Sequence, residues 1–275
     1  MEPMTDSTAT ALAHKARTAR TWKAPDFLLR LLSPLAILLL WELASRSGLI
    51  PSRVIAAPSE IGGTLWELIR SGELGYHLLV SLKRAVLGLT IGVAIGTAAA
   101  LVSGLSKRGE VILDSPMQML RTIPSLALVP LFILWFGIGE FTKIALIVTG
   151  TTFPVYLNLF AGIRNIDPKL VEAANTLGLN RRELIWHVIL PGALPSFFVG
   201  LRYSLGISWL ALVFVEQINT SAGIGYLASD ARDFMRTDVI VICLLIYSAL
   251  GLLIDGLIRT LERFALVWRP SFVRS

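Results

Sequence analysis

The sequence is poor in charge, which soluble proteins need on their surfaces. Charged residues make up 16% of its 275 residues, whereas a soluble domain carries roughly a quarter. Hydrophobic residues make up 54%, and the mean hydropathy is +0.69. This composition excludes an ordinary soluble domain and indicates a membrane protein. The net charge of +6 is then best explained by residues that set membrane topology, and no nucleic-acid partner is expected.

Cysteine and histidine are also scarce. The one cysteine, Cys243, lies inside an apolar run, so no intrachain disulfide, CxxC motif or zinc site can form. The three histidines, His14, His77 and His187, are far apart in the sequence, which makes a metal site improbable. The chain lacks a G-x-x-x-x-G-K-[ST] motif, so it does not bind ATP through a Walker loop. We expect no catalytic residues, no metal and no cofactor.

Long apolar segments predict an all-α membrane protein with six transmembrane helices. The expected spans are about 27–44, 85–105, 111–139, 143–163, 193–215 and 239–257. They form a membrane domain over 27–270, with a core of about 76–260, followed by a short C-terminal tail at 271–275. Residues 1–26 are basic and threonine-rich, as in a targeting presequence, but without a convincing cleavage site we interpret them as an unstructured cytoplasmic tail.

Small residues and prolines distinguish two of the spans. In the second, Gly88, Gly92 and Gly96 recur at four-residue steps, which lets another helix approach closely. Prolines interrupt the third span, and at membrane depth they kink a helix and free carbonyl groups. That span should therefore be buried in the bundle or line a path. Its prolines are Pro116, Pro124 and Pro130.

Two connections predict further structure on the outer side. Ser59 and Gly72 bound an amphipathic helix, which we expect along the outer membrane surface with Trp66 as an anchor. A contact with an external partner is the alternative. The loop 219–237 could meet a partner or form an outer gate, and a solvated connector is an equal alternative.

The most distinctive stretch is a polar island from Asp167 to Pro191. Asp167 begins a short helix that Gly178 ends, and Asn180 caps a second helix that should end at Pro191. Two amphipathic helices have apolar faces to bury, so a partner protein is expected, with the lipid surface as the alternative. The apolar face of the first helix is Leu170, Val171, Ala174 and Leu177.

This island also carries a spaced motif. Glu172-Ala173-Ala174 is followed by three residues, Gly178, nine residues and Val188-x-Leu190-Pro191. The motif resembles the EAA signature of permease subunits in binding-protein-dependent ABC importers, with Val188 where isoleucine is preferred. The resemblance implies that the loop 164–191 couples the chain to a cytoplasmic ATPase. The coupling residues implied are Glu172, Ala173, Ala174, Leu177, Gly178, Leu179 and Pro191.

Further blocks at 119–144, 187–216 and 221–232 look closely like the permeases of aliphatic sulfonate importers, with nitrate, taurine and bicarbonate permeases as near relatives. The resemblance covers roughly 27–270 and implies a type I, MetI-like permease fold without enzymatic activity of its own. The implied partners are two cytoplasmic ATPase subunits, a second permease copy in a homodimer, a periplasmic or lipid-anchored solute-binding protein and membrane lipid.

Positive charges predict the orientation. With the N-terminus inside, the cytoplasmic segments carry 14 Lys and Arg residues and the external segments carry 8. This bias predicts that both termini and the loop 164–191 lie in the cytoplasm. We expect the chain itself to lie in the inner membrane.

Ionisable residues in or near spans are candidates for the substrate path, because a charge at membrane depth needs a cavity or a partner. Arg202 would suit an anionic substrate such as a sulfonate, and the alternative is a structural pair with a carboxylate on another span. Arg121 is a second candidate, although it could instead mark the inner edge of its span. Glu216 is the third candidate.

Two other classes of protein remain open. A secondary carrier would need coupling carboxylates near mid-bilayer and paired repeats of spans, whereas Glu42, Glu216 and Asp255 lie near span ends. A membrane enzyme would need a metal or nucleophile constellation, and none is evident in the sequence.

Overall fold

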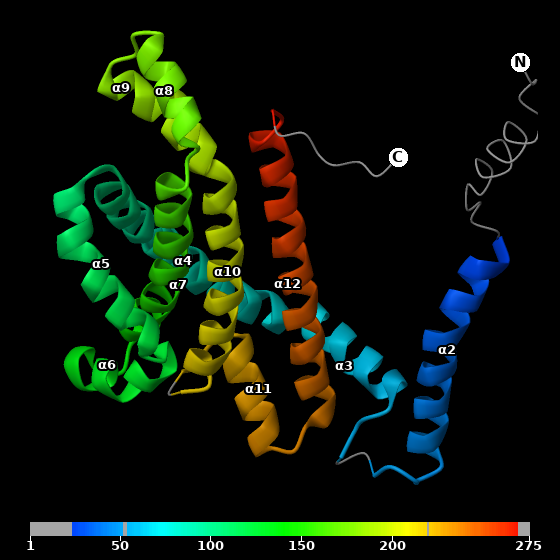
Figure 1. Ribbon diagram of the computed structural model, residues 1–275. Helices are drawn as coiled ribbons and strands as arrows, with labels where there is room; N and C mark the ends of the chain where they lie inside the picture. The colour runs from blue at the N-terminus through cyan, green and yellow to red at the C-terminus, as the bar shows by residue number, and fades with distance from the viewer. Residues whose placement is uncertain (1–23, 52–53, 219, 269–275) are drawn as a thin grey trace, which may run out of the picture. The chain divides into compact units, whose positions relative to one another are not determined.

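The computed structural model describes residues 24–51, 54–218 and 220–268, with side chains from Leu32 onward. Every regular element within those residues is a helix, which confirms the all-α prediction (Figure 1). The predicted tails, 1–26 and 271–275, lie wholly or almost wholly outside the described residues. The chain forms two compact units, Met1–Glu60 and Ile61–Ser275.

The first unit contains α2 (Ala24–Arg46), which coincides with the predicted first span. Near its end, Glu42 accepts hydrogen bonds from the Ser59 backbone N–H (3.0 Å) and hydroxyl (2.7 Å). Glu42 also pairs with Arg46 one turn further along. These contacts tie the end of α2 to Ser59, which lies in the same unit.

The second unit holds the remaining helices. Their bounds are α3 (Pro58–Arg70, which begins in the first unit), α4 (Glu73–Leu105), α5 (Lys107–Thr122), η2 (Ser125–Leu128), α6 (Val129–Phe136), α7 (Glu140–Arg164), α8 (Pro168–Thr176), α9 (Arg181–Leu184), η3 (Ile185–Ile189), α10 (Leu190–Glu216), α11 (Ile224–Asp233) and α12 (Thr237–Ala265). The amphipathic helix predicted from Ser59 is α3, and Gly72 ends it at a φ of +78°.

Four helical stretches of the described chain are long and apolar enough to cross a membrane: α4, α7, α12 and the run from Arg181 to Glu216. The predicted third span is broken, because α5 and the η2–α6 segment meet at 90°. The break falls at Ile123, which is extended (ψ 116°). A following proline disfavours the helical conformation of the preceding residue, so Pro124 explains where α5 stops.

The core is built around α7, which packs along α4 on one side and α10 on the other. The glycine stripe makes the α4 contact close, as predicted. A Cβ on Gly96 would lie 2.5 Å from the Thr152 carbonyl oxygen, and one on Gly88 would lie 2.5 Å from Ile147. Buried Tyr156 and Leu159 on α7 complete one cluster of this core.

The helix that begins at Arg181 does not end at Pro191, so that prediction is wrong. It continues through η3 into α10 and reaches Glu216. In η3 the helix widens, and Leu190 N–H donates to the Ile185 carbonyl five residues back. The wide turn of η3 directly precedes Pro191, the second residue of α10, at the place where an ordinary helix would meet the clash and the missing N–H of a proline.

The loop 219–237 is not a simple connector, because it contains α11. Ile224, Leu227 and Ala231 of α11 are buried, and the helix packs on α10 and α12. Figure 1 shows α11 at one end of the bundle and the α8–α9 hairpin at the opposite end.

Candidate functional site

The α8–α9 hairpin is held in shape by its own backbone and caps. The Asp167 side chain accepts from Lys169 N–H at 2.9 Å and begins α8. At the other end, Gly178 has a φ of +80°, its N–H donates to Asn175, and Leu179 N–H donates to Ala174. This pair of hydrogen bonds around a left-handed glycine is the Schellman motif, as the sequence predicted a glycine stop.

The second half of the hairpin begins with a complete capping box. The Asn180 side chain accepts from Arg182 N–H and Glu183 N–H, both at 3.0 Å. Glu183 reaches back and accepts from Asn180 N–H at 2.8 Å. The two helices are therefore joined by a stiff connection, because the polar backbone groups at the joint have partners within it.

Two leucines of the hairpin's predicted apolar face are exposed among polar residues. Leu177 is 79% exposed and Leu170 is 56% exposed, although Ala174 on the same helix is buried. The side chains of Glu172 and Ala173 are exposed as well. The structure thus brings together the predicted residues Glu172 to Leu179, while Pro191 lies away from them in the first turn of α10.

Beneath the hairpin lies a cavity of about 520 Å³. Its wall includes Glu172 and Arg181 from the hairpin and Ile163 from α7. The Arg181 guanidinium donates to the Leu105 carbonyl at the end of α4 at 3.1 Å, which ties the hairpin to the bundle. The hairpin therefore stands on the ends of α4 and α7, with Leu170 and Leu177 facing away from the cavity.

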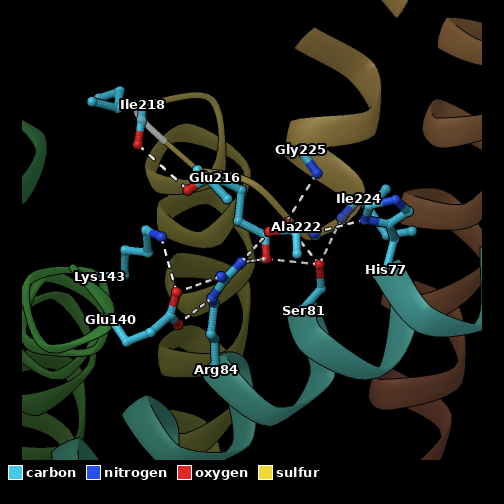
Figure 2. A network of polar contacts seen from close by, with 12 residues as sticks. His77, Ser81, Arg84, Glu140, Lys143, Glu216, Ile218, Ala222, Ile224 and Gly225 are labelled. Atoms are coloured by element: carbon cyan, nitrogen blue, oxygen red, sulfur yellow. Dashed lines mark hydrogen bonds and ion pairs between the residues drawn. The ribbon is translucent and has the colours of Figure 1, made fainter. Parts of the chain in front are cut away.

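At the opposite end of the bundle, Glu216 occupies the centre of a buried polar network (Figure 2). Its side chain is fully buried, and its carboxylate accepts from the Ser81 hydroxyl at 2.7 Å, Arg84 Nη1 at 2.8 Å and Gly225 N–H at 3.0 Å. Arg84 Nη1 also donates to the Ala222 carbonyl at 2.6 Å. These bonds fasten the turn before α11 to α4 and α10.

The same arginine reaches out to α7. Arg84 Nε and Nη2 each donate to Glu140 at 2.6 Å, and Lys143 Nζ donates to Glu140 at 3.0 Å. The Glu140 side chain is 57% exposed, so the network runs from a buried carboxylate to one at the surface. It links α4, α7, α10 and the turn before α11 through charge-assisted bonds.

Sequence reasoning counted Arg84 and Lys143 as external charges and missed this network. The useful signal was the spacing of His77, Ser81 and Arg84, which puts three polar side chains on one face of a helix. His77 belongs to the network too, because it accepts from Gly223 N–H at 3.0 Å. Glu216, a substrate-path candidate, has its carboxylate engaged here, and these surroundings favour a structural role.

The two candidate arginines have different surroundings. Arg202 on α10 donates to Glu262 at 2.6 Å and lies 3.6 Å from Asp255, both on α12. This is the structural pair considered as its alternative. Arg121 lies in the last turn of α5 and lines a cavity at the bend before η2.

The architecture is thus that of a polytopic membrane protein with the α8–α9 hairpin at one end and the polar network around Glu216 at the other. Residues 91–266 match the family model described as binding-protein-dependent transport system inner membrane component. The match covers more than half of the chain, which therefore belongs to this family of inner-membrane permeases.

Two curated relatives are highly similar. The putative aliphatic sulfonates transport permease protein SsuC of Escherichia coli (strain K12) is 48% identical, with 90% of this chain and 93% of the relative aligned. The protein of the same name from Bacillus subtilis (strain 168) is 46% identical, with 88% of each chain aligned.

A solved structure confirms the fold. The crystal structure of an amino acid ABC transporter with histidines superposes with a TM-score of 0.59 at 24% identity. It covers 68% of this chain and 91% of that chain. The predicted ABC-permease fold is confirmed by this likeness and by the family match.

Proposed function

We propose that this chain is the transmembrane subunit of an ABC importer and that its α8–α9 hairpin docks on a cytoplasmic ATPase. The observation that carries the proposal is the rigid hairpin with two exposed leucines. Leu170 and Leu177 are exposed at the two ends of α8, in a hairpin whose caps leave little freedom. A stiff, apolar projection suits a groove in a partner, because docking then orders few additional groups.

Glu172 adds charge to this surface. It has no ion-pair partner in the part of the chain that the structure describes, and it is exposed beside Ala173. The apolar side chains supply contact area to the docking surface. The Glu172 carboxylate adds polarity and can pair with a cation on the ATPase. The coupling residues that we assign are Glu172, Ala173, Ala174, Leu177, Gly178 and Leu179, while Pro191 acts through the turn that joins the hairpin to α10.

The proposed orientation places the hairpin and both termini in the cytoplasm. Positive charge supports it, because 14 Lys and Arg residues fall in the cytoplasmic segments and 8 in the external ones. Two of those 8, Arg84 and Lys143, are held in the Glu140 network. They are therefore less free to act as topological signals, and the effective bias is larger than the count.

The cargo that we propose is an aliphatic sulfonate, and the names of the two permeases reported above support it. By the same family likeness, two copies of this chain would combine with two ATPase subunits and one periplasmic or lipid-anchored solute-binding protein. The chain itself would then perform no catalysis, since ATP hydrolysis takes place on the partner. Nitrate and taurine are the competing substrates.

Reconstitution tests the proposal. The permease, its ATPase and its solute-binding protein are placed in proteoliposomes with ATP, and uptake of ethanesulfonate, taurine and nitrate is compared. We expect ATP-dependent uptake of ethanesulfonate. Uptake by the permease alone, driven by an ion gradient, would instead identify a secondary carrier.

A further inference from the structure

A cavity of about 320 Å³ lies where α5 bends into η2. Its lining comes from three separate stretches of the chain: the end of α5 with η2, the middle of α7 and the second half of α10. This volume falls at the lower end of the range for small-molecule sites. The cavity therefore has room for a small solute.

One part of the lining is polar and has unused hydrogen-bonding capacity. Arg121 has no ion pair or hydrogen bond within the described chain, in contrast to Arg84 and Arg202, which are paired with carboxylates. The Ser125 hydroxyl in the same lining also has no hydrogen-bond partner among the described residues. A guanidinium and a hydroxyl both donate, so the pair suits an oxyanion.

The remaining lining is apolar. Phe153 of α7 and Ile207 and Leu210 of α10 contribute hydrocarbon surface to the same cavity. A solute that fits both parts of the lining has an anionic head and a short hydrocarbon chain. An alkyl sulfonate has this chemistry, whereas an inorganic anion would leave the apolar wall without a contact.

Arg121 also lies far along α5 from the hairpin end, and its side chain is exposed within the described chain. It follows Lys107 by fourteen residues along one continuous helix, so it lies ~21 Å from the start of α5. That start is fixed near the hairpin end, because Glu110 in the first turn pairs with Arg164 at the end of α7. This distance along the helix argues against a residue that only marks the inner edge of the membrane.

We propose that this cavity is a sulfonate-binding subsite on the transport path, an inference that rests on the proposed function. Arg121 and Ser125 would hold the sulfonate oxygens, and Phe153, Ile207 and Leu210 would contact the alkyl chain. Gly150 sets the width, because a Cβ there would lie 3.0 Å from Ile207 and 3.5 Å from the Ser125 hydroxyl.

The test measures ATP-dependent uptake of ethanesulfonate and hexanesulfonate by the complete transporter in proteoliposomes, normalised to the ATPase that co-purifies. Arg121→Gln should lower uptake of both by about tenfold or more, because it removes a charge-assisted hydrogen bond. Arg121→Lys should retain more uptake than Arg121→Gln. Arg108→Gln, which changes an exposed arginine on the same helix, is the matched control and should not change uptake.

A second variant tests the apolar wall. Gly150→Ala should lower the uptake of hexanesulfonate relative to ethanesulfonate by about threefold or more, because one added methyl narrows a pocket measurably. If the Arg121→Gln permease does not assemble with its ATPase, the ratio of hexanesulfonate to ethanesulfonate uptake by Gly150→Ala tests the subsite instead. An unchanged ratio would then overturn the subsite.

The outcomes separate this inference from the proposed function. If the wild type and Arg121→Gln take up sulfonate equally well, the subsite is overturned and the proposed function stands. An equal loss in Arg121→Gln and Arg108→Gln overturns the subsite too. If the wild type takes up neither sulfonate, the proposed substrate fails and the subsite fails with it.

Discussion

At the scale of single residues, Glu216 is the most deeply buried charged residue of the described chain. It is a carboxylate with 1% exposure, and it is stabilised by an arginine, a hydroxyl and a backbone N–H. Removing one member of a buried ion pair leaves the other charged and poorly solvated. The same arginine meets Glu140, whose side chain is mostly exposed, so the two carboxylates provide a matched comparison.

Glu216→Gln should therefore destabilise the protein far more than Glu140→Gln. We expect a loss of about 3 kcal/mol for the buried position and a smaller loss for Glu140, because water reaches its exposed carboxylate although its partners Arg84 and Lys143 are buried. The unfolding midpoints of the two variants are compared by heating the detergent-solubilised permease and monitoring its circular dichroism. Equal unfolding midpoints for the two variants would show that burial does not set the strength of this network.

A second prediction at this scale concerns Glu172. Replacement by lysine reverses the charge on an exposed position of the hairpin and leaves the caps at Asp167 and Asn180 intact. Uptake should fall by about tenfold or more, because like charges across an interface are strongly unfavourable. The amount of permease in the membrane should stay at the wild-type level.

The matched control for this prediction is Lys169→Glu, a charge reversal on an exposed residue of the same helix that lies outside the EAA motif. Its effect on uptake should be smaller. Normal uptake by the Glu172→Lys permease would contradict docking through this face of α8.

At the scale of elements, the hairpin depends on one backbone conformation. Gly178 has a φ of +80°, which β-branched residues avoid and asparagine tolerates. Gly178→Val should rearrange the joint between α8 and α9 and reduce recovery of the ATPase in a pull-down. Gly178→Asn should preserve recovery, so equal recovery with the two variants would argue against the importance of this turn.

The elements also show how far sequence could go. The caps at Asn180 and Gly178 were predictable because each depends on residues within one or two turns of chain. The glycine stripe of α4 was predictable for the same reason, since helical spacing defines its face. The three prolines of the third span predicted kinks but not which proline breaks the helix, and the 90° angle depends on how η2 packs against α7 and α10.

Other features depend on residues that are remote in sequence. Arg84 and Glu216 are 132 residues apart, and no local pattern connects them, so Arg84 was taken for a loop residue. The continuity of the helix through Pro191 was missed because it requires a wide turn that proline content does not reveal. The cavity at Arg121 likewise needs four elements to form.

At the scale of the whole molecule, the two ends of the bundle should face opposite sides of the membrane. The chain offers a clean test, because its one cysteine, Cys243, is fully buried in α12. In a Cys243→Ser background, a cysteine at Thr176 in the hairpin should react with a membrane-impermeant maleimide only from the cytoplasmic side. A cysteine at Asp233, the last residue of α11, should react only from the external side.

The wild-type protein is the control and should react slowly from either side, since Cys243 is shielded. Labelling of the Thr176 position in intact cells, without permeabilisation, would place the hairpin outside. That result would contradict docking on a cytoplasmic ATPase.

The uninterrupted helix from Arg181 to Glu216 has a mechanical consequence. It is one rod of 36 residues, so ~54 Å long. One end belongs to the hairpin, and the other carries the carboxylate that holds the turn before α11. If this helix pivots near its middle, a displacement of the hairpin end moves the Glu216 end in the opposite direction. Because one rigid helix joins them, the hairpin end and the α11 end of the permease cannot move independently.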